Sequence, residues 1–233
     1  MTSQPTARDV APGLATPGPP RRQPTTVERL RDWHPTDRLA AWLVTASITL
    51  FAFAIRLWNV GYPRNLVFDE TYYAKDAWSL LTSGYERDWP ADANTSILAG
   101  NVDLADAGAF VVHPPVGKWL IAAGEAAFGL NSFGWRISAV VFGSLLVFVT
   151  IRLARRLSRS TMVGAIAGLL LTLDGLAFTM SRIALLDVFQ AFFLVAAVSA
   201  LVADRDWFRS RLADALDRTG RPDLGRAFGP LAW

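Results

Sequence analysis

The sequence of 233 residues contains no cysteine, which excludes disulfide bonds and thiolate chemistry and leaves the redox compartment unassigned. Histidine is nearly absent, since only His34 and His113 occur, and this argues against a zinc site of the usual histidine-rich kind. Lys75 and Lys118 are the only lysines, and every other basic residue is arginine. We interpret this bias as a property of the proteome and predict no nucleic-acid partner, no cofactor and no metal site.

Apolar residues make up 52% of the chain and are concentrated in runs, which is typical of membrane spans. The run Leu39–Leu57 has nineteen residues and one charge, Arg56. As a helix it would be about 28 Å long, close to the ~30 Å of a hydrocarbon core. Three further runs predict spans at Ile137–Leu153, Thr161–Met180 and Ile183–Ala203. We therefore expect an all-α integral membrane protein with four transmembrane helices.

The composition divides the chain into three parts. Residues 1–36 are rich in proline, threonine and arginine and predict a disordered tail. Residues 37–203 form the membrane region, whose spans are separated by a long loop at 58–135. Residues 204–233 form a basic, arginine-rich segment.

The long loop itself shows three patterns. Apolar residues at helical spacing predict a short amphipathic helix at Thr71–Leu81, and Asp88–Ala109 has the composition of an irregular loop. Val116–Leu130 is apolar but short and carries Lys118 and Glu125. This segment predicts an interfacial or re-entrant helix.

Basic residues indicate the orientation. Arginines gather before the first span, between the second and third spans, and after the fourth, whereas residues 69–125 carry mostly acids. Because short cytoplasmic flanks carry the excess of Lys and Arg, both termini are predicted to be cytoplasmic. The loop at 58–135 is then predicted to face outward, and we expect a multi-pass protein of a bacterial plasma membrane.

Ionisable residues gather at one depth in this topology. Charges inside a membrane cost roughly 2.5–3.5 kcal/mol at a helix centre and therefore usually line a functional cavity. Carboxylates and cations that converge at the outer leaflet suit an enzyme acting on a phosphorylated lipid, because cations bind phosphate and a carboxylate accepts a proton. The residues concerned are Asp69, Glu70, His113, Lys118, Arg136, Asp174, Arg182 and Asp187.

Each of these residues also has a structural interpretation. Asp69 is well placed to cap the helix that follows it, with Glu70 favourable at the helix dipole. His113 precedes two prolines and suits a rigid turn, and Arg136 suits an interface anchor. Asp174 and Asp187 could pair with the neighbouring arginines.

Four motifs in order resemble the N-terminal part of the protein O-mannosyltransferases, which are membrane enzymes of the GT-C type. They are FDE at Phe68–Glu70 with the TYYAKDA that follows, HPPVGK at His113–Lys118, FGWR at Phe133–Arg136 and SRIALLD at Ser181–Asp187. The resemblance extends from about Leu39 to Asp204. The family also has a long first outer loop with short interfacial helices.

The resemblance implies transfer of mannose from a polyprenyl-phosphate-mannose donor to Ser or Thr hydroxyls of exported proteins, with inversion at the sugar carbon. By the same resemblance Asp69 is the general base, and Glu70 supports it or positions the acceptor. Arg136 binds the donor phosphate, which removes the need for a metal. His113, Lys118, Arg182 and Asp187 are candidates for lining the site. The expected partners are the lipid donor, the acceptor proteins, membrane lipid and the secretion translocon.

Members of that family are longer and have more spans, so we expect this chain to be a fragment or a truncated product. Two alternatives stay open. One is a GT-C enzyme that moves another lipid-linked sugar, such as aminoarabinose or arabinose. The other is a non-catalytic four-span scaffold or transporter fragment in which Asp–Arg pairs only hold helices together.

Overall fold

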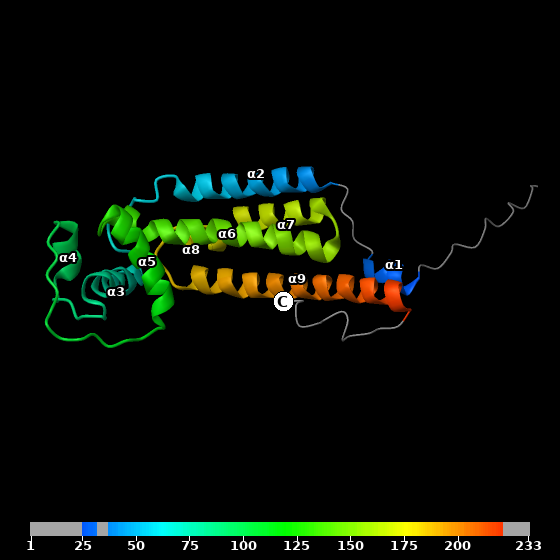
Figure 1. The fold of residues 1–233 in the computed structure, drawn as a ribbon. Coiled ribbons are helices and arrows are strands. Elements are labelled where there is room, and N and C mark those ends of the chain that lie inside the picture. Colours follow the sequence, from blue (N-terminus) through cyan, green and yellow to red (C-terminus); the bar gives the residue numbers. More distant parts are fainter. Residues whose placement is uncertain (1–24, 32–36, 221–233) are drawn as a thin grey trace, which may run out of the picture. The chain divides into compact units, whose positions relative to one another are not determined.

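The computed structural model describes residues 25–31 and 37–220, whose regular structure is helical apart from one isolated bridge between Arg87 and Gly108. Figure 1 shows the helices. They are α1 (Thr26–Arg31), α2 (Arg38–Leu57), α3 (Glu70–Ser83), α4 (Ala93–Leu98), α5 (Pro115–Phe128), α6 (Ser132–Ser158), α7 (Thr161–Leu173), α8 (Gly175–Met180) and α9 (Asp187–Thr219). The predicted all-α membrane class is confirmed.

The chain forms two compact units. The smaller unit includes α1 and the last residues of α9, from Leu212 onward. The larger unit, Trp33–Arg211, carries every candidate site residue. The disordered tail predicted for 1–36 falls mostly outside the described residues, but α1 lies within it and is helical. The basic segment predicted from residue 204 continues α9 as far as Thr219, and residues 221–233 lie outside the described part.

Within the described residues, three helices are long and apolar enough to cross a membrane, namely α2, α6 and α9. The second and fourth predicted spans are longer in the structure than the apolar runs indicated. The third predicted span, 161–180, is wrong as one continuous helix. It ends at Leu173, and Asp174 adopts an extended conformation before α8 begins. The Asp174 carboxylate accepts a hydrogen bond from the Ala177 N–H (2.7 Å), so this residue caps a new helix and interrupts the old one.

Helices α2, α6 and α7 lie side by side in Figure 1 and pack closely. Ile48 and Ala52 of α2 meet Val147 and Ile151 of α6 in a buried cluster. Gly168 of α7 lies against Ile151, where any added Cβ would collide with that side chain. Small residues of this kind let membrane helices approach closely.

The C-terminal end of α2 is tied to the chain that follows α8. Arg56 is buried, and its Nε donates to Ser181 Oγ (2.7 Å) while one Nη donates to the Ala52 carbonyl (3.3 Å). The guanidinium therefore faces the protein interior. This fixes the turn between Ser181 and α9 against the end of α2, next to the candidate site.

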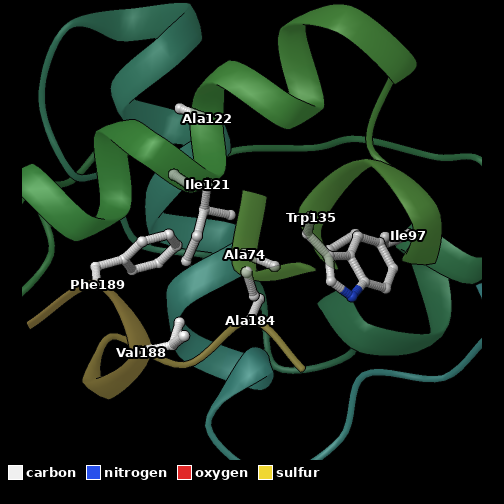
Figure 2. Close-up of a cluster of buried hydrophobic side chains, with 10 residues drawn as sticks. Ala74, Ile97, Ile121, Ala122, Trp135, Ala184, Val188 and Phe189 are labelled. Carbon is white, nitrogen blue, oxygen red and sulfur yellow. The ribbon is translucent and has the colours of Figure 1, made fainter. Parts of the chain in front are cut away.

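A second core positions the segment after α2. Figure 2 shows Ala74 of α3, Ile121 of α5, Trp135 of α6 and Val188 of α9 in one buried cluster. Helix α5 crosses α6 where Gly124 meets the backbone of Gly134. These contacts fix α3 and α5 over the end of the helix bundle.

The helix predicted at Thr71–Leu81 is confirmed as α3, which ends at Gly84 in the left-handed conformation (φ 80°). The loop predicted at Asp88–Ala109 contains the short helix α4, which the sequence did not indicate because its six residues show too little periodicity. The segment predicted at Val116–Leu130 is helical as α5. Its interfacial placement stays a prediction.

Candidate active site

The segment between α2 and α3 brings the two adjacent carboxylates to the end of the bundle. Phe68 has a left-handed backbone conformation (φ 54°), which is uncommon for a bulky residue and frequent at functional sites. It sets the direction in which α3 begins. The carboxylates of Asp69 and Glu70 consequently point into different surroundings.

Glu70 is completely buried, and its side chain forms a closed network. Its Oε1 accepts from Arg136 Nε (2.7 Å) and from the Ala184 N–H (2.9 Å). Its Oε2 accepts from Arg136 Nη2 (2.7 Å) and from the Val67 N–H (2.9 Å). One carboxylate thus joins the loop before α3 to α6 and to the turn before α9.

Arg136 completes this network. Asn131 caps α6 by accepting from the N–H groups of Phe133 and Gly134, which places Arg136 in the first turns of the helix. Besides the two bonds to Glu70, its Nη groups donate to three backbone carbonyl groups. These belong to Val60 (3.0 Å), Pro63 (2.8 Å) and Asn65 (3.0 Å). All five N–H groups of the guanidinium are therefore engaged within the protein.

This geometry bears on the role predicted for Arg136. The side chain is 1% exposed, and a phosphate would have to displace one of the five bonds to reach it. Its role as a phosphate ligand stays a prediction that the geometry does not favour. Glu70 likewise has no oxygen free for an acceptor, which favours the supporting role among the two predicted for it.

Asp69 is half-buried and precedes the first residue of α3. Its side chain makes no capping hydrogen bond to the helix, so the interpretation of Asp69 as a side-chain cap is wrong. Among the described residues, no hydrogen bond or ion pair to its carboxylate is found. Asp69 instead lines a cavity of about 600 Å³.

The cavity lies along one side of α3 and is also lined by two later segments of the chain, around Trp89 and around Phe110. Aromatic and charged residues occur in roughly equal numbers in its lining. It consists of Asp69, Tyr72, Tyr73, Lys75, Asp76, Arg87, Asp88, Trp89, Ala109, Phe110, Val112 and His113. Such a mixture is typical of small-molecule sites, which combine apolar walls with a few placed polar groups.

Tyr73 brings three of the predicted site residues together. Its ring meets the ring of His113 edge-on, with centroids 5.7 Å apart. Burial raises the pKa of its phenol, and the negative charges of Asp69 and then Asp187 raise it further. Asp69, His113 and Asp187 therefore lie near one side chain that sequence reasoning did not single out.

Lys118, another predicted site residue, is buried and bound to two carboxylates. Its Nζ lies 2.9 Å from Asp76 Oδ2 and 2.8 Å from Glu86 Oε2. Burial raises the pKa of Asp76 despite the opposing effect of the Lys118 ammonium. Lys118 thus contacts the cavity only through Asp76, which is itself a lining residue.

Arg182 lies in the turn between α8 and α9, two residues before Ala184, whose N–H binds Glu70. One Nη donates to the Trp58 carbonyl (2.7 Å), and the guanidinium lies 5.0 Å from the centroid of the Phe178 ring. It is half-exposed, in contrast to Arg136. Asp174 is exposed and serves as the cap of α8.

Sequence reasoning missed Tyr73, Asp76, Glu86 and Trp89. The spacing from Asp69 to Tyr73 and Asp76 is four and seven residues, which is one face of a helix, and this signal could have identified two of them. Glu86 and Trp89 had no comparable signal. In the part of the chain that the structure describes, no group of three or more acidic or histidine side chains is placed to hold a metal ion.

Comparison with known proteins supports one family. The family model described as dolichyl-phosphate-mannose-protein mannosyltransferase matches residues 46–210, well over half of the chain. A polyprenol-phosphate-mannose–protein mannosyltransferase of Mycobacterium tuberculosis (strain CDC 1551 / Oshkosh) is 46% identical over 188 residues, 79% of this chain and 33% of the relative. A protein of the same name in Mycolicibacterium smegmatis (strain ATCC 700084) is 44% identical over 237 positions, covering 100% of this chain and 41% of the relative.

A more distant relative has another donor in its name. An undecaprenyl phosphate-alpha-4-amino-4-deoxy-L-arabinose arabinosyl transferase of Pseudomonas aeruginosa (strain LESB58) is 33% identical over 199 residues, 81% of this chain and 33% of the relative. The chain spans about a third to two fifths of the length of these relatives. No solved structure matches it significantly. On the match over residues 46–210, the chain belongs to the dolichyl-phosphate-mannose-protein mannosyltransferase family.

Proposed function

We propose that this chain forms the base-bearing part of a glycosyltransferase that moves mannose from polyprenyl-phosphate-mannose to Ser or Thr hydroxyls of exported proteins. Family membership and the names of the mycobacterial relatives support the donor and the acceptor class. The observation that carries the proposal is the contrast between two neighbours. Both oxygens of the Glu70 carboxylate accept hydrogen bonds within the protein, whereas the Asp69 carboxylate lines a cavity and is available to a ligand.

In the proposed reaction the acceptor hydroxyl attacks the anomeric carbon of mannose from the side opposite the phosphate. Asp69 takes the hydroxyl proton as the new C–O bond forms, and the bond from the anomeric carbon to the phosphate oxygen breaks. The polyprenyl phosphate leaves with the electron pair, and the sugar carbon is inverted. The Asp69 carboxylate suits this role because its oxygens can accept a proton and it lines a concave site.

The donor phosphate needs a cation whose N–H groups are available. We propose that Arg182 supplies them and that Arg136 acts through Glu70 as a positioning residue. Arg182 is half-exposed, and Trp58 is the only described residue to which its guanidinium donates a hydrogen bond in the structure. A developing negative charge on the leaving phosphate would be stabilised by such a fixed guanidinium.

The test is Asp69→Asn in the complete protein that carries this sequence, assayed in membranes with a polyprenyl-phosphate-mannose donor and a Ser/Thr-rich peptide. Loss of a general base lowers turnover by about 10²–10⁴-fold. Asp103→Asn is the matched control, because Asp103 is exposed and does not line the cavity. Near-normal turnover of Asp69→Asn contradicts the assignment.

The aminoarabinose alternative rests on the Pseudomonas relative and is tested by the donor. Wild-type membranes given polyprenyl-phosphate-aminoarabinose would then transfer sugar to a lipid acceptor and leave the peptide unmodified. A scaffold without catalysis predicts no transfer with either donor. The mannosyltransferase proposal predicts label in the peptide alone.

We also propose that both termini are cytoplasmic and that the cavity opens at the outer face of the plasma membrane. The arginine distribution supports this orientation. Because these 233 residues contain no cysteine, a single replacement adds the one thiol of this stretch. A membrane-impermeant maleimide applied to intact cells would label Asp103→Cys and spare Ser158→Cys, and the reverse pattern contradicts the orientation. Contacts with membrane lipid and the secretion translocon remain part of the same proposal.

A further inference from the structure

The cavity extends well beyond the proposed base. Asp69, Tyr73 and Asp76 lie on one face of α3 and line the same space. Seven residues of helix separate the two carboxylates, which is about 10 Å along the axis. Asp88 and Trp89 also line this space. A ligand that reacts beside Asp69 therefore has room to extend along α3 toward Asp76.

The charges of the lining around Asp76 and Asp88 do not suit a phosphate. Asp69, Asp76 and Asp88 outnumber Lys75 and Arg87. The Arg87 guanidinium is already engaged, since its groups donate to the Ala105 carbonyl (2.9 Å) and to Asp106 Oδ1 (3.1 Å). An anion would meet net negative charge here. An uncharged ligand with several hydroxyl donors would instead find carboxylate acceptors.

Asp76 is held rigidly for such contacts. Lys118 Nζ binds its Oδ2 and is itself fixed by the buried Glu86. Among the described residues no hydrogen bond to the other oxygen, Oδ1, is found, so it can accept from a further donor. Lys75 lines the cavity as well, and burial lowers the pKa of its amine. Asp76 thus offers a hydrogen-bond acceptor, and its neighbour Lys75 offers a donor. This pair suits hydroxyl groups, because each hydroxyl can both donate and accept a hydrogen bond.

Aromatic rings complete the lining. Trp89 is partly buried, and its indole N–H donates to the Lys75 carbonyl (3.3 Å), which orients the ring. Tyr73 and His113 form a second aromatic wall. Flat apolar faces combined with fixed carboxylates match a pyranose ring, which presents C–H groups on its faces and hydroxyls at its edge.

We propose that the part of the cavity formed by Asp76, Asp88 and Trp89 binds the hexopyranosyl group of the donor. The two carboxylates accept hydrogen bonds from sugar hydroxyls, and Trp89 packs against the ring. The sugar then lies between Asp76 and Asp69, with its anomeric carbon toward the base. The inference rests on the proposed function, because it places the mannosyl group relative to Asp69.

Asp88→Asn and Trp89→Leu in the complete protein test the inference. Asp88 is exposed, and its backbone bonds to Ala107 and Ala105 survive the side-chain change, so folding is preserved. Each lost contact to a charged or stacked group raises the donor KM by about tenfold or more and leaves the acceptor KM unchanged. Asp103→Asn and Trp119→Leu are matched controls, since both residues are exposed and neither lines the cavity.

A second readout separates this inference from the proposed function. Saturation-transfer NMR with methyl mannoside on purified protein should show binding to the wild type and to both controls, and weaker binding to Asp88→Asn and Trp89→Leu. This pattern without any transfer activity would support the sugar site and overturn the proposed function. Transfer activity with an unchanged donor KM, or with only the acceptor KM raised, would overturn the sugar site. Absence of methyl mannoside binding to an active wild type would also count against it.

Discussion

The two regions around Glu70 and around Asp69 differ in whether their charged groups are paired. At the end of the helix bundle, Glu70 and Arg136 satisfy each other and three backbone carbonyl groups in a dry environment. Along α3, the Asp69 carboxylate faces a cavity and is available to a ligand. The two acids are adjacent in sequence, so the difference comes from the direction of each side chain. A closed network holds its surroundings in place, whereas an open carboxylate is free to take a proton.

The largest effect is expected from Glu70→Ala. This change leaves the Arg136 guanidinium buried with its charge unpaired, and such a loss destabilises a protein by about 3–5 kcal/mol. We expect little folded protein and no transfer activity. Thermal unfolding in detergent and the yield of monodisperse protein measure the effect.

The double variant Glu70→Leu with Arg136→Met is the control for that experiment. Replacing both charges removes the unpaired group, so it should be more stable than Glu70→Ala. A Glu70→Ala protein as stable as wild type would show that the network does not hold the fold, and the contrast between the two regions would fail.

A third carboxylate extends the comparison, because Glu125 is buried and has no partner for either oxygen within the described residues. Burial raises its pKa to about 9, so the folded protein keeps this group neutral while the unfolded chain ionises it near 4.5. The folded state therefore binds the extra proton between these two values. The contribution of Glu125 to the free energy of unfolding is greatest below about pH 4.5. It falls as pH rises to 9, by up to about 1.4 kcal/mol per pH unit.

Glu125→Gln should abolish that slope. The difference in unfolding free energy between Glu125→Gln and wild type is expected to grow from pH 6 to pH 8 by about 2.7 kcal/mol. Thermal unfolding across this range, with Glu28→Gln as an exposed control, measures it. A difference that does not change with pH would mean that Glu125 is paired or hydrated in solution.

Arg136→Lys distinguishes a positioning role from phosphate binding. An ammonium group has three donors and cannot reproduce five bonds, so we expect a loss of roughly 1–3 kcal/mol in stability. The donor KM of the folded fraction should stay close to wild type. A raised donor KM with unchanged stability would restore Arg136 as the phosphate ligand. Arg182→Lys is the matched variant, for which the proposal expects the opposite pattern.

The sequence carried much of this arrangement. Apolar runs predicted the membrane helices, and helical spacing predicted α3. The gathering of charges predicted a site near Asp69 and Glu70, and that site stays a prediction. It did not reveal that Glu70 pairs with Arg136, 66 residues away, or that Lys118 pairs with Glu86. Such pairs depend on how helices cross and on which way each side chain leaves its backbone. The break at Asp174 was not predicted either. The leucines around it favour one continuous helix, whereas the Asp174 side chain caps a new helix.

The smallest effect is expected for the stability of Asp69→Ala. A side-chain cap at this position would contribute about 1 kcal/mol, because it would satisfy a free N–H at the start of α3. The structure has no such bond, and a half-exposed residue without partners changes stability by less than about 0.5 kcal/mol. Unfolding of Asp69→Ala, compared with Asp174→Ala, whose carboxylate does cap α8, measures the difference. Equal losses in the two variants would show that Asp69 caps α3 in solution, whereas an unchanged Asp69→Ala protein without activity would assign this carboxylate to the reaction alone.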